Sequence, residues 1–155
     1  MASAHARRRI HAPIDQVWTA ATDLAGACER LSGVERIELL TGAAFGVGTR
    51  WRETRVAAGP SVTEELVVVE CVPKQRFAVD ATSGAAVFRA VTTMEAVRNG
   101  QTEVRVALDA PPSGVAARLV GAVLGTLAAR TVVATLNRDL DDLARWCERP
   151  ARRPR

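Results

Sequence analysis

The chain has 155 residues, of which 48% are hydrophobic and 25% charged, and its formal net charge is +4 at pH 7. These values are typical of a folded globular protein and exclude extensive disorder. The length suits one hydrophobic core, so we expect a single domain over residues 1–149 and a basic, disordered tail at 150–155.

Composition also limits the cofactors, partners and location. The three cysteines are widely spaced, with no CxxC pair and no nearby histidine, which indicates neither a disulfide framework nor a metal site. The charged N-terminal residues do not fit a signal peptide, so we expect a cytoplasmic protein. We also expect no cofactor. The uncharged run 119–129 is too short to span a bilayer, and we expect no stable membrane insertion. No aromatic residues are interleaved with the basic clusters at 7–9 and 151–155, so we do not expect nucleic-acid binding.

The first elements are a strand and two short helices. Pro13 follows a β-like segment and suits the first turn of a helix, where its missing N–H has no partner. Val17 and Ala21 then share one helix face with Trp18 beside them, and we expect Trp18 to pack in the core. Helical spacing of apolar residues predicts a second short helix over 24–31.

From Val34 to about Ala110 the apolar period becomes alternating, with turn signals at regular intervals. This pattern predicts about six antiparallel strands joined mostly by hairpins, or about seven with the first strand. The clearest turn is Asn99-Gly100. The residues predicted to face the interior around it are Phe88, Ala90, Thr92 and Met94 before the turn and Thr102, Val104, Val106 and Leu108 after it.

Residues 114–148 predict one long C-terminal helix. Its second half is amphipathic, with an apolar stripe at Leu136, Leu140, Leu143 and Cys147 and with Arg138, Asp142 and Arg145 on the other side. We expect Asp141 and Asp142 to form surface ion pairs with Arg145 and Arg138 rather than to bind a metal. The stripe continues backwards through Gly121, Gly125, Ala129 and Val132. Small side chains there permit either close helix–sheet packing or a hollow between the layers, and the sequence pattern favours neither alternative.

The order of these elements, together with I-x-A-P-x-x-x-V-W at 10–18, resembles the START/Bet v 1-like superfamily. The similarity is greatest to its bacterial polyketide cyclase/dehydrase and lipid-transport group, and includes VGTRWRE at 47–53 and LNRDLDDLARW at 136–146. The resemblance implies an α+β helix-grip fold, in which a curved antiparallel sheet surrounds the long helix. It also implies a largely apolar cavity between helix and sheet.

The strand pair around Gly59 carries the ionisable residues that we expect inside. A turn over 57–61 centred on Gly59 would pair Trp51 with Val67, Glu53 with Glu65, and Arg55 with Thr63. The face carrying Trp51, Val67, Val69 and Cys71 is apolar enough to be the interior, so Glu53, Arg55 and Glu65 would point inward as well. A shift of one residue at the turn would reverse this assignment.

Two carboxyl groups held in an apolar cavity do not both ionise without cost, so one would keep its proton. Glu53, Glu65 and Arg55 are therefore candidates for acid–base catalysis of an aldol cyclisation or dehydration. An internally neutralised ion cluster at the cavity mouth is the alternative, because structural ion pairs also perturb pKa values. The lack of tyrosine, and the placement of both histidines on the predicted outer face, count against an enzyme.

Three functions remain open. The first is binding or transport of a hydrophobic, aromatic or lipid-like small molecule by a monomer or homodimer. Its predicted binding residues are Trp51, Arg55, Glu65, Val67, Val69, Phe88, Thr92, Met94, Leu108 and Leu119. The second is a polyketide aromatase/cyclase-type enzyme, and the third is a protein that contacts a partner or an acidic membrane through its terminal arginines.

Overall fold

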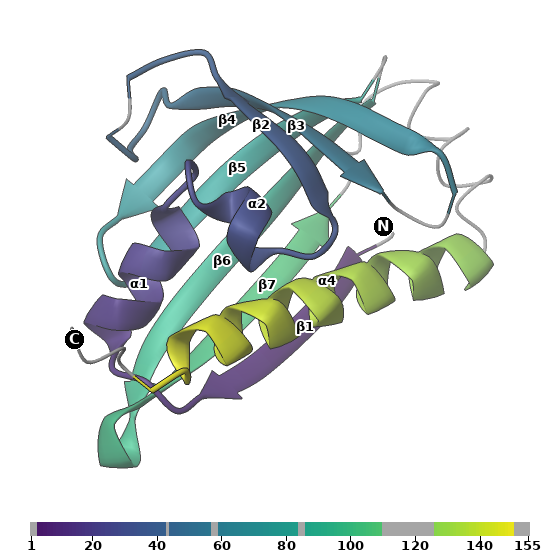
Figure 1. The fold of residues 1–155 in the computed structure, drawn as a ribbon. Helices are drawn as coiled ribbons and strands as arrows, with labels where there is room; N and C mark the ends of the chain where they lie inside the picture. Colours follow the sequence, from purple (N-terminus) through teal and green to yellow (C-terminus); the bar gives the residue numbers. More distant parts are fainter. Residues whose placement is uncertain (1–2, 43, 57–58, 84–85, 110–125, 151–155) are drawn as a thin grey trace.

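The computed structural model describes residues 3–42, 44–56, 59–83, 86–109 and 126–150. One curved sheet wraps around a long helix, and two short helices lie beside that helix (Figure 1). In chain order the elements are β1 (Ser3–Ile10), α1 (Ile14–Thr22), α2 (Ala27–Arg30), β2 (Val34–Leu39), β3 (Arg50–Val56), β4 (Ser61–Val72), β5 (Arg76–Ser83), β6 (Ala86–Val97), a 3-10 turn (Arg98–Gly100), β7 (Gln101–Asp109) and α4 (Thr126–Cys147).

The sheet has seven strands in the order β1-β7-β6-β5-β4-β3-β2, and all neighbouring strands are antiparallel. The chain therefore runs through consecutive hairpins from β2 to β7, and β1 pairs with the last strand. This arrangement confirms the predicted helix-grip fold. The concave face of the sheet is the face that α4 covers (Figure 1).

The local signals for α1 and for the β6–β7 hairpin are confirmed. Pro13 is the N-cap of α1, and Trp18 packs against the core and meets the Phe77 ring edge-on at a centroid distance of 5.8 Å. Asn99 and Gly100 have φ values of 65° and 68°, the left-handed conformation that their residue types tolerate best. The hairpin brings Met94 opposite Val104, and both are buried on the concave face.

The main core lies between α4, α1 and the β1, β7 and β6 strands. The predicted stripe of α4 is confirmed, since Leu140, Leu143 and Cys147 are buried and Leu136 packs against the same cluster. A second core cluster lies farther along the sheet, around Trp51, Val68 and Val79. Phe77 contacts both clusters.

The prediction that Asp142 lies on the solvent side of α4 is wrong. The residue is 6% exposed, and its Oδ2 accepts hydrogen bonds from the Ser32 amide at 2.8 Å and the Ser32 hydroxyl at 2.7 Å. Arg145 pairs with Asp142, three residues away in the same helix, rather than with Asp141, and Asp141 pairs with Arg8 of β1 at 2.5 Å. Partners that lie outside α4 thus override the helical spacing.

The first half of the predicted long helix, with Leu119, Gly121 and Gly125, lies outside the described residues, as does the side chain of Ala129. Val132, the last member of that stripe, is half-buried. Among the described helices, none combines the length and apolar character needed to cross a membrane.

Candidate functional site

Strand β3 places three of the predicted site residues on the concave face. Trp51, Glu53 and Arg55 alternate along this strand, so their side chains point to the same side of the sheet. Trp51 is 4% and Glu53 is 8% exposed, whereas Arg55 is half-buried. This inward orientation agrees with the sequence prediction.

The predicted partner on β4 is wrong by one residue. Val56 pairs directly with Ser61, so the turn spans four residues rather than five, and Glu53 lies opposite Glu64. Glu65 instead lies opposite Arg52 on the convex face, where it pairs with Arg50 and approaches Arg52 at 3.9 Å. The carboxyl group that joins Glu53 on the concave wall is therefore that of Glu64.

The same shift corrects the apolar wall. Leu66 and Val68 take the concave positions predicted for Val67 and Val69, and Val67 lies opposite Arg50 and Asp80 on the convex face. A β-bulge between Val68 and Glu70 then inserts one extra residue, so the residues after it point to the faces that were predicted for them. Cys71 consequently packs against the Trp51 cluster as predicted.

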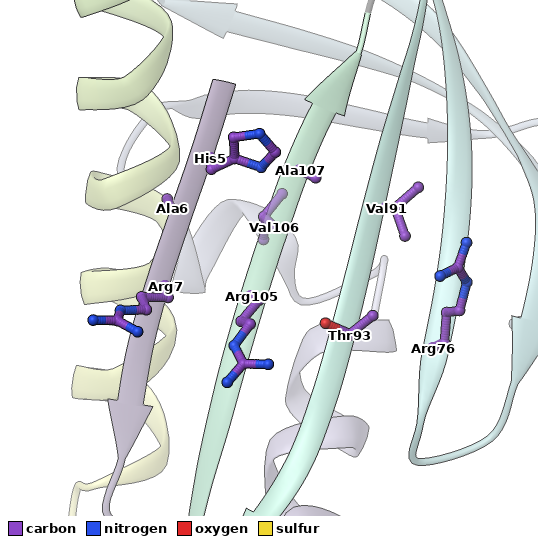
Figure 2. A pocket seen from close by; sticks show the side chains of 9 residues that line it. All are labelled: His5, Ala6, Arg7, Arg76, Val91, Thr93, Arg105, Val106 and Ala107. Carbon is purple, nitrogen blue, oxygen red and sulfur yellow. The ribbon is translucent and has the colours of Figure 1, made fainter. Parts of the chain in front are cut away.

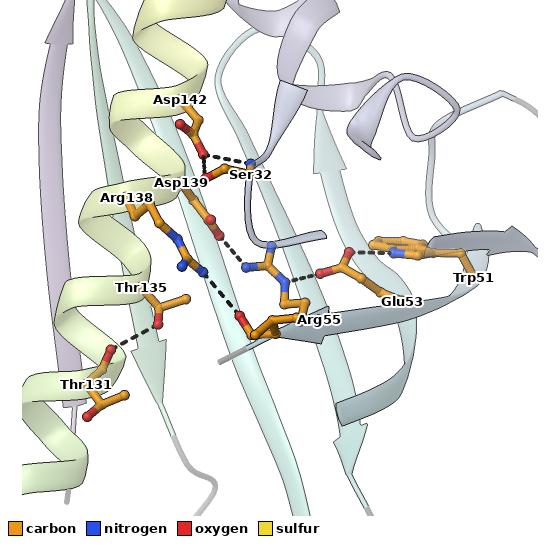
Figure 3. A network of polar contacts seen from close by, with 10 residues as sticks. Ser32, Trp51, Glu53, Arg55, Thr131, Thr135, Arg138, Asp139 and Asp142 are labelled. Atoms are coloured by element: carbon orange, nitrogen blue, oxygen red, sulfur yellow. Dashed lines mark hydrogen bonds and ion pairs between the residues drawn. The ribbon is translucent and has the colours of Figure 1, made fainter. Parts of the chain in front are cut away.

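Asp139 of α4 completes a polar cluster across the space between helix and sheet (Figure 3). The Trp51 indole N–H donates to Glu53 Oε2 at 3.2 Å, and Arg55 Nε donates to Glu53 Oε1. The second contact of Arg55 is from Nη1 to Asp139 Oδ2 at 2.7 Å. The cluster thus links β3 to the helix through one shared guanidinium group.

Nearby polar contacts hold the same side of α4. Arg138 Nη2 donates to the carbonyl oxygen of Val56 at 3.4 Å, and Asp142 receives the two Ser32 hydrogen bonds one turn farther along (Figure 3). These contacts fix the helix against β3 and the segment before β2. They also hold Asp139 at a set distance from Arg55.

The cluster holds more acidic than basic groups. Burial would lower the pKa of Arg55, but Glu53 and Asp139 outweigh it and raise that pKa, so Arg55 remains charged. Burial raises the pKa of Glu64, with a further contribution from Glu53, and Arg55 opposes the shift. Burial also raises the pKa of Asp139 against the attraction of Arg55. Glu64 and Asp139 are therefore the carboxyl groups best able to keep a proton.

One acceptor in this cluster is left available. Asp139 Oδ1 is buried and has no hydrogen-bond partner among the residues that the structure describes. A buried carboxylate oxygen without a donor is costly, and a ligand hydroxyl or amine would satisfy it. The arrangement can therefore accept hydrogen bonds from a polar group placed between α4 and β3.

The remaining predicted wall residues are on β6 and β7. Thr92 and Met94 are buried and Phe88 and Leu108 half-buried, all on the concave face by their pairing. Leu119 lies outside the described residues. In the parts of the chain that the structure covers, no group of three or more metal-ligating side chains has the arrangement of a metal site.

Sequence reasoning missed Glu64 and Asp139. Glu64-Glu65 is followed by Leu66 and three valines, so either parity of β4 yields an apolar face, and only the turn length decides between them. Asp139 precedes Leu140 and follows Leu136 by three residues, a spacing that places it at the edge of the apolar stripe. That spacing was the available signal for a carboxylate facing the sheet.

The fold and the cluster between helix and sheet define the chain as a helix-grip protein. Residues 1–148 match the family model described as "Polyketide cyclase / dehydrase and lipid transport", and the chain belongs to this family. No curated protein matches the sequence.

Solved structures give the same fold. Protein TTHA0849 from Thermus thermophilus is 23% identical, with a TM-score of 0.75, and the match covers 92% of this chain and 94% of that one. A START superfamily protein from Mycobacterium smegmatis is 12% identical, with a TM-score of 0.76 and coverage of 94% and 97%. The Zhui aromatase/cyclase from Streptomyces sp. R1128 is 19% identical, with a TM-score of 0.67 and coverage of 92% and 93%. Family and fold thus fit ligand-binding or polyketide-cyclase-type roles.

Proposed function

We propose that the protein binds an apolar, aromatic or lipid-like small molecule between the concave face and α4, with the polar end of the ligand at the Arg55 cluster. The observation that carries this proposal is the placement of Glu53, Arg55, Glu64 and Asp139 on facing walls of the fold, beside the apolar Trp51 cluster. An apolar wall with a few convergent polar groups is the usual composition of a small-molecule site.

The charges of the cluster favour a particular kind of polar end. Arg55 already faces two carboxylates, and three carboxyl groups surround it. A ligand carboxylate would add negative charge to an acidic site, whereas a hydroxyl or amine would donate to Asp139 Oδ1 or Glu64. We therefore favour phenols, alcohols and amines over fatty acids as ligands.

A binding experiment with paired variants tests this proposal. The neutral dye N-phenyl-1-naphthylamine would report occupancy by its fluorescence, and 2-naphthol would compete with it. At a pH above the raised pKa of Glu64, where its carboxyl group is ionised, Glu64→Gln is expected to weaken 2-naphthol binding about fivefold through loss of a charged acceptor. The matched control, Glu65→Gln, removes the same charge from the convex face and leaves the affinity unchanged.

Two results would contradict the proposal. If the wild-type protein binds neither the dye nor 2-naphthol, the receptor role fails. If Glu64→Gln and Glu65→Gln weaken 2-naphthol equally, the polar end does not lie at the cluster.

A second candidate function, aromatase/cyclase-type catalysis, is favoured by one observation. Glu53 and Glu64 lie opposite each other, and the pKa of Glu64 is raised by its burial and by Glu53. Glu64 could then protonate a carbonyl oxygen while Glu53 accepts a proton in an aldol cyclisation or dehydration. Incubation with a poly-β-ketone mimic tests this function, with full turnover expected in Glu65→Gln and none in Glu64→Gln. Turnover that survives in Glu64→Gln would exclude that role.

A further inference from the structure

The convex face of the sheet carries a basic groove far from the concave cluster. The groove has a volume of about 570 Å³, and it spans β1, β7, β6 and β5 (Figure 2). Its lining residues are His5, Ala6, Arg7, Arg76, Val91, Thr93, Arg105, Val106 and Ala107. No carboxylate is among them, so the lining itself carries three guanidinium groups and no acidic group.

The strand register explains how the basic residues come together. Arg7 lies opposite Arg105, Arg105 opposite Thr93, and Thr93 opposite Arg76. Paired residues point to the same face of a sheet, so the three arginines form one row across four strands. At about 4.8 Å per strand the row is about 14 Å long. Ala107 and Val91, one step along the strands, leave a trough of small side chains beside the row.

The fold itself does not require this row. Like charges directly opposite each other in an antiparallel pair are unfavourable, and Arg7 and Arg105 are such a pair. Two neighbouring pairs are attractive, because Arg9 lies opposite Glu103 and Asp80 opposite Arg89, whereas Glu95 opposite Glu103 is a second like-charge pair on this face. An unfavourable local arrangement on an exposed face is typical of a binding surface.

Two of these guanidinium groups already bind carboxylates of the protein itself. Glu70 pairs with Arg76 at 2.7 Å, and Glu103 pairs with Arg105. Both arginines remain about half exposed, so each keeps guanidinium N–H groups that can reach an incoming carboxylate beside the existing pair. Arg7 has no ion pair within the described part of the chain, so both ends of its guanidinium group can donate to a ligand carboxylate.

We propose that this groove binds an acidic, extended segment of a partner protein. Alternate side chains of an extended peptide are about 6.8 Å apart on one face, so two or three acidic residues match the length of the row. Their carboxylates would take bidentate contacts from Arg7, Arg105 and Arg76, and the small residues between them would lie over the trough. The lining has no Phe, Tyr or Trp for stacking on bases and no protruding apolar residue for membrane insertion, which disfavours those two partners.

Fluorescence anisotropy with a labelled peptide of alternating Glu and Ala, about ten residues long, tests the proposal on the full chain. We expect saturable binding that weakens as salt rises to about 0.15 M. Arg7→Gln or Arg105→Gln should each weaken binding about fivefold, and the double variant about twentyfold. A peptide of alternating Gln and Ala should not bind.

Arg36→Gln is the matched control, because Arg36 is exposed at the far edge of the same sheet face, opposite Thr54. This variant should bind the acidic peptide as tightly as the wild type. Absence of peptide binding, or equal weakening in Arg36→Gln and Arg7→Gln, would overturn the proposal. So would loss of affinity for phosphatidylglycerol vesicles or for oligo-dT in Arg7→Gln while peptide binding is retained.

Discussion

Glu64 and Glu65 show how one position along a strand decides the role of a residue. Glu64 faces Glu53 inside the grip, where burial raises its pKa, and Glu65 lies on the convex face beside Arg50 and Arg52. The two residues have the same side chain. Only their environments make Glu64 a candidate site residue and Glu65 a member of a surface ion pair. Substitutions at the two positions should therefore have different effects on the stability of the protein.

Glu64→Gln is expected to stabilise the protein at neutral pH. A carboxyl group whose pKa is raised by folding holds its proton more tightly in the folded state, so stability falls as pH rises from 4.5 through the raised pKa. Gln stays neutral at every pH, so it has no charged form that burial would disfavour. The melting temperature at pH 7 should rise by about 2 °C, and the gain should vanish below pH 4.5.

Glu65→Gln should leave the melting temperature unchanged or lower it slightly, because exposed ion pairs contribute little. Thermal unfolding of both variants between pH 4 and pH 8 checks the pair. A lower melting temperature for Glu64→Gln than for Glu65→Gln at pH 7 would contradict the inward position of Glu64.

Asp142 should make stability depend on pH in the opposite direction. Burial would raise its pKa, but the hydrogen bonds from Ser32 and the contact with Arg145 outweigh burial and lower it below 3.8. The stabilisation is therefore present above pH 3.8 and is lost as pH falls through the depressed folded pKa. Asp142→Asn should cost about 1.5 kcal/mol at pH 7, measured by urea unfolding, with the two proteins converging in acid.

Asp141→Asn is the control for that measurement, since Asp141 is half exposed and pairs with Arg8. Its effect should be less than about 0.5 kcal/mol. An equal loss in both variants would show that charge at this end of α4, rather than the hydrogen bonds from Ser32 to Asp142, provides the stability.

The elements differ in how well the sequence predicts them. The β6–β7 hairpin, the start of α1 and the apolar stripe of α4 depend on signals within a few residues, and all are confirmed. Which side chains of β4 point to the concave face depends on the length of the preceding turn. The run of three valines does not reveal it, because either choice gives an apolar face. The burial of Asp142 was not predicted because its hydrogen-bond partner, Ser32, is distant in the sequence.

The pairing of β1 with β7 makes a further prediction at this scale. Arg7→Gln removes a like-charge pair with Arg105, and it should raise the melting temperature by about 1 °C. Arg9→Gln removes an attraction to Glu103, at 3.8 Å, and should not raise it. Differential scanning calorimetry of the two variants tests this contrast, and a lower melting temperature for Arg7→Gln than for Arg9→Gln would count against a cost of the arginine row.

At the scale of the whole molecule, one sheet presents two chemically different faces. The concave face carries the Trp51 cluster and the charges that join β3 to α4, and the convex face carries the arginine row. Family membership and fold could be predicted from the sequence because the order of elements is itself a signal. The charges that gather on each face could not, because they depend on register between strands and on contacts between β3 and α4.

The most direct test of the proposed receptor role is a crystal structure of the protein grown with 2-naphthol. The naphthol rings should lie between α4 and the concave face against the Trp51 cluster, with the hydroxyl within hydrogen-bond distance of Glu53, Glu64 or Asp139. An interior filled by side chains, with naphthol absent or bound only on the convex face, would contradict it.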